Sequence, residues 1–582
     1  MRLSFRCVIL LCVAATFTLA ATPHETLSAL IEENWQYRLQ VHPEFATFIG
    51  DNRYNDRLSD NSPAAIAKET QHERELLAAL EKIDVAKLSA EDKLNQSLLI
   101  RGLKTSIASA QFKDWEMPAT QMWGPHLAYA GLAKEMPFLT TGDYRNYLSR
   151  LQKLPGVLNQ AIANMREGMR DGLMPPRFLL GKVAEESADI AGKPVQQSLF
   201  AQPVQHFPEG IAAADRARLT KEINEAVRTQ VLPAYAAFAK FVKDEYEPKG
   251  RAEFGIWSLP DGQARYRQDI VEQTTTTSDP EELHNLGLKQ VAEIEKEMLA
   301  IANKHGYADL KSFNAHVVAD PRWHGTSGEQ ILGLYAKDTD QMYAKLPQYF
   351  GRLPKNKLAV VPMEAYRAPH EVPADYSIGA GDGSRPGRIN VNEYEPTKRL
   401  LLNVEAIAYH EGIPGHHLQF SITQELTGLP PFRKFANYNA FSEGWALYAE
   451  TLAHEMGFYQ DEFSEYGRLQ NLMWRSIRLV VDTGVHSKHW SRQQMIDFFH
   501  QHSAMDDQNI ETEVDRYIAW PAQALGYKLG EMTILRLRER ARQQLGSALD
   551  IRAFHDAVLD KGPLPLDVLE SSVDQWIAAQ KK

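Results

Sequence analysis

Cysteine is almost absent from this chain of 582 residues, because only Cys7 and Cys12 occur and both lie near its start. Residues 1–21 have the pattern of a secretory signal peptide: Arg2 and Arg6 precede a short apolar run, and small residues follow it. A mature chain without this segment contains no cysteine. That composition excludes disulfides, thiolate metal ligands and a cysteine nucleophile.

The apolar run of the signal, 7–15, is too short to span a bilayer as a permanent anchor. Leu11 stands before Cys12, where a lipoprotein signal has a small residue, so we expect cleavage after Ala20 or Ala21 and no membrane anchor. Positive charge is outnumbered by negative charge, with 64 Lys and Arg against 75 Asp and Glu, and the net charge of −11 becomes about −13 once the two arginines of the signal are lost. We therefore expect a periplasmic or secreted protein that does not bind nucleic acid or anionic membranes.

Flexible linkers, low-complexity tracts and internal repeats are missing as well. Apolar residues recur at spacings of three and four throughout, which predicts a mainly α-helical protein. We divide it into a helical N-terminal region, 22–270, and a second region, 271–582. The predicted helices include 25–40, 64–83, 90–109, 144–171, 280–306, 331–349, 511–528 and 532–545. Segments 358–361, 376–380 and 388–392 are short and bounded by Gly and Pro, and they predict a small sheet.

The nine residues 409–417, Tyr-His-Glu-Gly-Ile-Pro-Gly-His-His, carry the clearest chemical signal. A His-Glu pair followed by another His offers two imidazole ligands and a carboxylate that can activate metal-bound water, as in zinc peptidases. The usual motif spaces its histidines four residues apart, whereas His416 and His417 follow His410 by six and seven. On a regular helix, His416 would lie roughly 120° from the face of His410, and His417 would lie about 10 Å along the axis.

Three residues between the histidines explain how this spacing can still work. Gly412 and Gly415 relax the backbone, and Pro414 has no amide proton and would clash with the carbonyl of His410 in a regular helix. We therefore predict a two-residue bulge over 412–415, which returns His416 to the place of an ordinary i+4 ligand. The alternative is a helix that ends at Gly412, followed by a polar loop with two ordinary histidines.

A third ligand is predicted further along the chain. The helix-forming run that begins at Phe441 carries Glu443 and Glu450, which are seven residues apart and share a face. Two histidines from one helix and a glutamate from the next is the arrangement of glutamate-zinc peptidases. The alternative for Glu443 is an acid that only stabilises the first turn of its helix. With the histidine motif upstream, we assign Glu443 to the metal.

These residues resemble the bacterial family known as domain of unknown function 885, which is grouped with the zincin-like (gluzincin) metallopeptidases. The resemblance rests on segments 382–387, 410–416, 442–448, 513–517 and 521–528. It implies a large helical zincin-type fold, with a small sheet beside the zinc-binding helix, a deep cleft, and residues 271–582 as the catalytic region. It also implies one Zn²⁺ per chain, held by His410, His416 and Glu443, with Glu411 as the catalytic base.

Further candidates concern the substrate. Peptide hydrolysis creates an oxyanion that needs a hydrogen-bond donor, and we assign this role to Tyr527 first and Tyr517 second; the alternative for either is a tyrosine of the core. Arg516, beside Tyr517, and Arg385, which could meet a substrate carboxylate, are candidates for substrate binding.

The segment 388–392 is the candidate edge strand on which an extended peptide pairs, with Asn390 as a substrate-binding residue. This assignment follows the resemblance to zincins and the general logic of strand addition. The alternative is a buried strand of the scaffold.

The resulting prediction is an exported zinc-dependent peptidase that hydrolyses short peptides by metal-activated water with Glu411 as general base. Two alternatives remain open. One is a zinc hydrolase that acts on a non-peptide amide or ester, which would use the same metal ligands. The other is an exported helical binding protein without enzymatic activity, whose histidines are incidental.

Overall fold

The computed structural model describes all residues except 1–20, 365–367, 369–370, 382, 384 and 582. Residues 1–20 of the predicted signal peptide, with both cysteines, therefore lie outside the described residues, as do two positions of the segment 382–387. Within the described part of the chain, no helix is long and apolar enough to cross a membrane.

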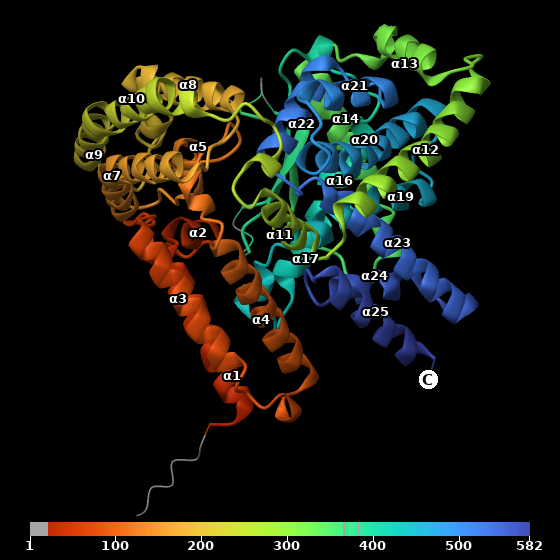
Figure 1. Cartoon of the computed structure of the whole chain (residues 1–582), viewed down its shortest axis with the longest axis horizontal. Helices are drawn as coiled ribbons and strands as arrows, with labels where there is room; N and C mark the ends of the chain where they lie inside the picture. Colours follow the sequence, from red (N-terminus) through yellow and green to blue (C-terminus); the bar gives the residue numbers. More distant parts are fainter. Residues whose placement is uncertain (1–20, 365–367, 369–370, 382, 384, 582) are drawn as a thin grey trace, which may run out of the picture.

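The first part of the chain is a succession of helices joined by turns and by longer loops (Figure 1). Thr22 and Thr140 each form a capping box, with Glu25 and Asp143 respectively, and so satisfy backbone N–H groups that a helix start leaves free. The helices are α1 (Pro23–Val41), α2 (Pro43–Phe48), α3 (Pro63–Leu80), α4 (Ala90–Ala110), α5 (Pro125–Ala130), α6 (Leu132–Glu135), α7 (Thr141–Asp171), α8 (Arg177–Gly192), α9 (Ala213–Ala226) and α10 (Leu232–Phe241). The predicted helices of this region correspond to α1, α3, α4 and α7.

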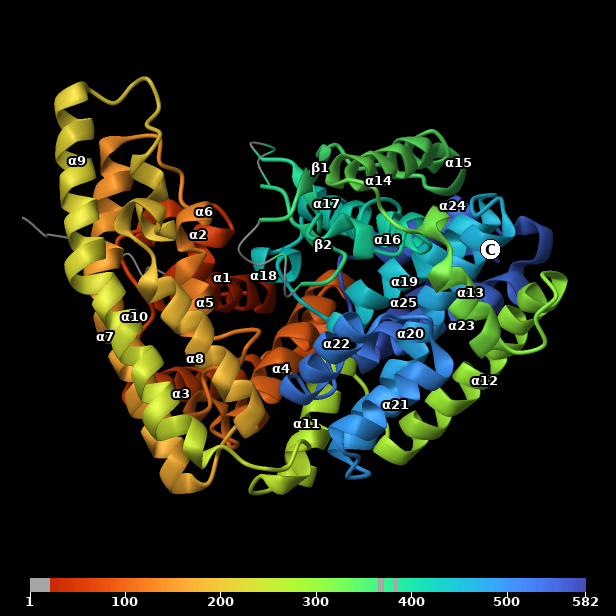
Figure 2. The same cartoon turned by 90° about the horizontal axis from the view of Figure 1, so that it is seen from above.

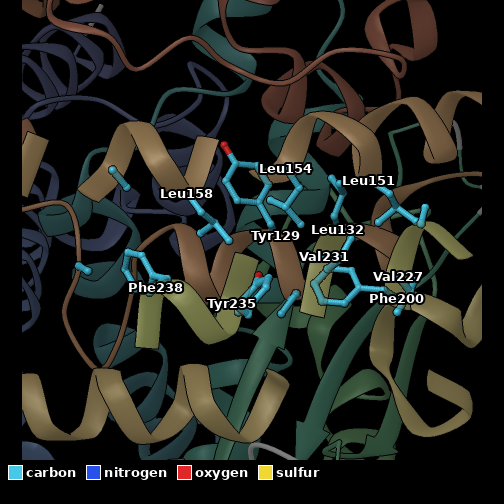
Figure 3. Packing of buried hydrophobic residues seen from close by; sticks show 14 of the residues in the cluster. Tyr129, Leu132, Leu151, Leu154, Leu158, Phe200, Val227, Val231, Tyr235 and Phe238 are labelled. Atoms are coloured by element: carbon cyan, nitrogen blue, oxygen red, sulfur yellow. The ribbon is translucent and has the colours of Figure 1, made fainter. Parts of the chain in front are cut away.

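The helices from α5 to α10 share one apolar core. Tyr147 and Tyr235 bury their rings in it, and their hydroxyls donate to the carbonyls of Phe200 and His126 at 3.0 and 2.9 Å. Because these buried hydroxyls keep their hydrogen bonds, they do not offset the gain from burying the rings. Figure 3 shows this core, which includes Tyr129, Leu132, Leu151, Leu154, Leu158, Phe200, Val227, Val231, Tyr235 and Phe238.

The helix α11 (Gly262–Thr274) lies between the two halves of the chain in Figures 1 and 2. It packs against α4 on one side and against α23 (Leu525–Leu545) on the other. The predicted boundary between the regions 22–270 and 271–582 falls inside α11, and this helix contacts both halves. Beyond it follow α12 (Pro280–Lys304), α13 (Leu310–Ala319), α14 (Gly328–Tyr343) and α15 (Leu346–Tyr349).

A small sheet is present, in the order β1-β3-β2, built from β1 (Leu358–Pro362), β2 (Ala374–Ser377) and β3 (Gly387–Val391). β3 runs parallel to β1 and antiparallel to β2, so both of its edges are already paired. The prediction that 388–392 is an edge strand is therefore wrong, and the scaffold alternative holds. The physical reason is burial: Ile389 and Val391 are fully buried in a cluster that includes residues of α14 and of α16 (Val404–Glu411).

The chain then returns to helices, most of which lie to the right of the sheet or below it in Figure 2. They are α16, α17 (His416–Glu425), α18 (Pro431–Lys434), α19 (Asn439–Glu455), α20 (Glu462–His486), α21 (Arg492–His502), α22 (Asp507–Ala519), α23, α24 (Ile551–Leu559) and α25 (Leu566–Gln580). Helices α19 and α23 touch backbone to backbone, because a Cβ on Gly444 would lie only 2.3 Å from the Cα of Gly530. This approach brings Glu443 and Tyr527 to the same region.

The predicted helix 511–528 is in fact two helices, because α22 ends at Ala519 and α23 begins at Leu525. Pro521 has no N–H to donate, and Ala522 adopts a positive φ of 63°. The N–H of Ala522 instead donates to both carboxylate oxygens of Asp482 on α20, at 3.1 and 3.2 Å. A contact distant in sequence thus fixes this turn.

Candidate metal centre

The turn 412–415 separates α16 from α17 and contains a cis peptide bond between Ile413 and Pro414. The N–H of Gly415 donates to the carbonyl of Tyr409 at 3.0 Å, six residues back instead of the four of a regular helix. The turn therefore accommodates two extra residues, the number predicted for the bulge over 412–415. The chain accommodates them by dividing into two helices, and His416 is the first residue of the second.

Two close contacts explain the residues of this turn. A Cβ on Gly415 would lie 2.0 Å from the carbonyl oxygen of His410, so only glycine can approach the end of α16 so closely. The carbonyl of Pro414 accepts a hydrogen bond of 2.9 Å from the indole N–H of Trp445, which is fully buried in α19. The helix that carries Glu443 thus also holds the turn between the two histidines.

His410, His416 and Glu443 come together, with one ligand atom of each within 4.8 Å of the others. Nε2 of His410 lies 3.5 Å from Oε2 of Glu443, and Nε2 of His416 lies 3.3 Å from the same oxygen. Burial acts to raise the pKa of Glu443, but the two histidines outweigh burial and hold the pKa well below its ordinary value. The carboxylate is thus the stable form, as a metal ligand requires.

Glu450 fixes the orientation of His410. Its Oε1 accepts a hydrogen bond of 2.7 Å from Nδ1–H of His410, and its Oε2 accepts one of 3.3 Å from Asn471. A carboxylate can only accept, so Nδ1 carries a proton, and Nε2 is the ring nitrogen directed toward Glu443.

His417 is placed differently from His416. Its ring is fully buried, with Nδ1 at 3.0 Å from the hydroxyl of Tyr376 and Nε2 at 3.1 Å from the carbonyl of Asn356. Burial lowers its pKa to about 4. His417 therefore supports the sheet and takes no part in the three-residue cluster.

A cavity of about 630 Å³ opens onto the cluster. His410, Glu411, His416 and Glu443 all line it, as does Tyr527. Burial raises the pKa of Glu411 to about 8, and Glu443 adds to this effect while His416 opposes it. In the absence of a further cation, Glu411 therefore tends to hold its proton near neutral pH.

Tyr527 faces the cavity beside the cluster. Its ring stacks on that of His410, with centroids 6.2 Å apart and an interplanar angle of 14°. Its hydroxyl accepts a hydrogen bond of 3.0 Å from Arg516, which also lines the cavity and donates to Gln523 at 2.7 Å. Since that hydroxyl accepts from Arg516, its own proton remains available to donate to an oxygen in the cavity.

Tyr517 does not line the cavity. Its hydroxyl donates to Glu513 and accepts from Arg478 at 2.9 Å and from Trp474 at 3.1 Å. The ring is fully buried, and burial raises the pKa of the hydroxyl. These contacts favour the alternative of a core tyrosine for Tyr517, and Tyr527 is the better placed of the two candidates.

Two predicted substrate-binding residues lie outside the cavity wall. The side-chain amide of Asn390 donates to Asp375 at 2.6 Å and to Ser377 at 2.8 Å, so it links β3 to β2. Arg385 lies 3.7 Å from Glu135 of α6, and this ion pair connects the two halves of the chain. Both side chains are engaged elsewhere in the fold, and only Arg516 of the three candidates lines the cavity.

Several residues of the cavity wall are absent from the candidates that the sequence predicts. Asp375 of β2 and Arg475 and Arg478 of α20 line the cavity with the cluster. The two arginines lie three residues apart in the sequence, within a run, 472–481, whose other residues are apolar except for Ser476, and this pattern is a signal for buried charge on one helix face. Asp375 gave no such signal, because its place depends on the order of strands in the sheet.

The chain belongs to the family described as bacterial protein of unknown function (DUF885), whose profile matches residues 43–573. This match covers most of the chain, including every residue of the cluster. No curated protein matches the chain.

Two solved structures have the same fold. One is described as "the putative lipoprotein from Colwellia psychrerythraea", is 26% identical, covers 96% of this chain and 100% of its own, and gives a TM-score of 0.91. The other is described as "a putative lipoprotein of unknown function from Shewanella oneidensis", is 18% identical, covers 95% of this chain and 99% of its own, and gives a TM-score of 0.72. The helical architecture with its small sheet is thus shared along nearly the whole chain.

Proposed function

We propose that the protein is an exported zinc-dependent peptidase that hydrolyses short peptides. The observation that carries this proposal is the meeting of His410, His416 and Glu443 at the wall of a cavity that Glu411 also lines. Two imidazoles and a carboxylate form the ligand set of glutamate-zinc peptidases, and such catalytic sites leave one position open. The grouping of the family with zincin-like metallopeptidases belongs to the same proposal.

The three residues fit one Zn²⁺ per chain. Ligand atoms at the usual distance of about 2.0–2.1 Å from zinc lie about 3.3–3.4 Å from one another on a tetrahedron. The two contacts with Oε2 of Glu443, at 3.5 and 3.3 Å, are close to that value. The hydrogen bond from His410 to Glu450 adds the carboxylate that zinc-binding histidines commonly have behind them.

A bound zinc ion would lower the pKa of a water molecule and polarise the substrate carbonyl. Glu411 would take the proton of the attacking water at its carboxylate, while the water oxygen forms a bond to the carbonyl carbon. The C–N bond then breaks, and the amine leaves with the proton that Glu411 held. Tyr527 would donate its hydroxyl proton in a hydrogen bond to the oxygen that gains negative charge.

The cavity and the sheet support a peptide substrate. The cavity volume of about 630 Å³ is in the range that holds a few residues. Ala374, Asp375 and Tyr376 line it, and they belong to β2, which lies at an edge of the sheet. An extended peptide would pair with β2, which takes the place of the edge strand predicted at 388–392.

The exported location is supported by the signal pattern of residues 1–21 and by the descriptions of the two structural neighbours. Both neighbours are described as putative lipoproteins, and a lipid anchor on this chain would require modification of a cysteine such as Cys12. The intact mass of the protein isolated from its native membrane and soluble fractions separates the two routes. An N-terminus after Ala20 or Ala21 supports the unanchored form, whereas a lipid-modified Cys12 would contradict it.

The proposal is tested by zinc analysis together with turnover of a peptide library read by mass spectrometry. We expect one zinc per chain and cleaved peptides. In the variant Glu411→Gln all three ligands remain, so zinc should stay bound while kcat falls by roughly 10² or more. Glu405→Gln is the matched control, because Glu405 lies on the same helix but contacts Tyr409 and Tyr459 instead of the cavity.

Two results would overturn the proposal in different ways. Absence of stoichiometric zinc would leave a binding protein with incidental histidines. Full zinc with turnover of esters or non-peptide amides, but of no peptide, would leave a zinc hydrolase of another class.

A further inference from the structure

Buried arginines form one wall of the cavity. Arg475 and Arg478 have exposed fractions of only 4% and 1%, and Arg516 approaches them from α22. The guanidinium groups of Arg475 and Arg478 lie over the ring of Trp474, at 4.1 and 4.6 Å from its centroid. Such stacking fixes the two side chains in place and offsets part of the cost of burying their charge.

The acidic partners of this wall are too few. Glu513 serves both Arg478, at 2.9 Å, and Arg516, at 3.4 Å. The remaining acid is Glu450, whose Oε1 lies 3.8 Å from Arg475 and already accepts the hydrogen bond of His410. Three guanidinium groups therefore share two directly paired carboxylates, and Arg475 has the longest of the three contacts, with an acid that is also bonded to His410.

The hydrogen-bond donors show the same imbalance. Among the described residues, Nε and Nη1 of Arg475, Nη1 of Arg478 and Nε of Arg516 are buried without a hydrogen-bond partner. Burial lowers the pKa of Arg475, and Glu450 opposes this effect without overcoming it. Buried donors of a charged group are costly when unpaired, so their accumulation at a cavity wall marks the place of an anionic ligand.

Tyr527 connects this wall to the metal centre. One contact of its ring is with His410, at 6.2 Å between centroids, and another is with the guanidinium of Arg478, at 4.2 Å. The arginines are thus about one aromatic ring away from the cluster. A peptide advances about 3.3–3.6 Å per residue, so a group one or two residues beyond the scissile bond would reach them.

Other residues of the cavity limit what the anion can be. Asp375 lines the same cavity and would repel a ligand with several negative charges. A single planar carboxylate suits both conditions, because it carries one charge and matches the fork of a guanidinium group.

We infer that Arg475, with Arg478 and Arg516, binds the C-terminal carboxylate of the substrate, so that the protein removes residues from the carboxyl end of peptides. This inference rests on the proposed peptidase function and makes it more specific. Arg475 is the principal residue, because it has the largest share of unpaired donors.

The test uses the zinc-loaded full-length mature chain and four versions of one peptide. These are the free peptide, its N-acetylated form, its C-terminal amide, and an amide whose last residue is Asp. We expect the first two to be cleaved, and both amides to lose roughly 30-fold or more in kcat/KM, the scale for losing one partner of a buried charge pair. Equal turnover of the simple amide would overturn the inference, and rapid turnover of the Asp amide would show that a side-chain carboxylate is recognised instead.

Variants assign the effect to the wall. Arg475→Gln should lower kcat/KM for the free peptide by a similar factor and leave the slow turnover of the amide nearly unchanged. Arg475→Lys keeps the positive charge and should retain part of the kcat/KM that Arg475→Gln loses. If the glutamine variant does not fold, the lysine variant provides the same comparison. Arg468→Gln is the matched control, because Arg468 is buried on the same helix but pairs with Glu465 away from the cavity. A drop for acid and amide alike in Arg475→Gln would contradict the assignment.

A binding measurement separates this inference from the proposed function. In zinc-loaded Glu411→Gln, calorimetric titration should show tighter binding of the free peptide than of its amide, by roughly 30-fold or more. If the wild type cleaves no peptide but this preference is found and requires Arg475, the carboxylate site stands and the peptidase proposal fails. If peptides are cleaved without any such preference, the peptidase proposal stands and the carboxylate site fails.

Discussion

Glu450 accepts a hydrogen bond of 2.7 Å from Nδ1 of His410, and both side chains are almost completely buried. Glu450 lies two turns after Glu443 on α19, so one helix supplies a ligand of the cluster and the group that orients another. Arg475 lies 3.8 Å from the same carboxylate. The candidate metal centre and the arginine wall therefore share one charged residue.

Glu450→Gln should lower the affinity for zinc by about 10- to 100-fold, because it removes the charge behind His410 while keeping the size of the side chain. Zinc titration by calorimetry measures this change. Glu455→Gln serves as the control, since Glu455 lies on the same helix and pairs instead with Arg538. Unchanged affinity in Glu450→Gln would show that the hydrogen bond does not tune the metal ligand.

His416→Ala and His417→Ala should have opposite consequences. His416 contributes an atom to the cluster, so its loss should abolish tight zinc binding. His417 bonds to Tyr376 and to the carbonyl of Asn356, so its loss should lower Tm by leaving two buried groups unpaired while zinc still binds. Zinc titration and thermal unfolding of both variants decide the matter. Loss of zinc in His417→Ala alone would reverse the assignment of the second histidine ligand.

Tyr527→Phe and Tyr517→Phe form a second contrasting pair. Loss of the Tyr527 hydroxyl removes the proposed donor to the oxyanion, so kcat should fall by about 10²-fold with little change in KM. Loss of the Tyr517 hydroxyl removes contacts with Glu513, Arg478 and Trp474, so Tm should fall instead. Kinetics and calorimetry on the same preparations measure both effects. A normal kcat in Tyr527→Phe would leave that residue a structural role only.

Local patterns in the sequence were sufficient for most helices and for the residues of the cluster. Helices such as α4 and α7 have their apolar spacing and caps within their own segments, so their limits were predicted to within a few residues. The bulge between His410 and His416 could likewise be predicted locally, because Pro414 and Gly415 lie between the two histidines and allow the backbone to turn there.

The remaining features depend on contacts between distant segments, which a single sequence does not reveal. The central place of β3 follows from pairing with strands on both sides, and the same segment would fit an edge. The turn at 520–524 depends on Asp482, and the close approach of α19 and α23 depends on Gly444 meeting Gly530. The assignment of Arg475 to a substrate carboxylate depends on its burial and on its unpaired donors, which only the folded structure shows.

Asp482 is a buried acid outside the cluster. Its Oδ1 accepts a hydrogen bond of 2.6 Å from the hydroxyl of Tyr266, and its carboxylate accepts the N–H of Ala522. Burial raises the pKa of Asp482 from 3.8 to about 7, although these hydrogen bonds oppose the effect. The folded chain therefore holds a proton on Asp482 at pH values where the unfolded chain has released it.

This difference predicts how stability depends on pH. Below pH 4 the group is protonated in both states, and as pH rises from about 4 to about 7 the folded state is progressively destabilised relative to the unfolded one. Asp482→Asn cannot ionise, yet its side-chain oxygen can still accept from Ala522. The Tm of the variant minus that of the wild type should therefore increase between pH 4.5 and pH 8, whatever other groups titrate in both proteins. Scanning calorimetry across this range measures the difference, and a value that stays constant with pH would show that Asp482 is ionised in the folded protein throughout.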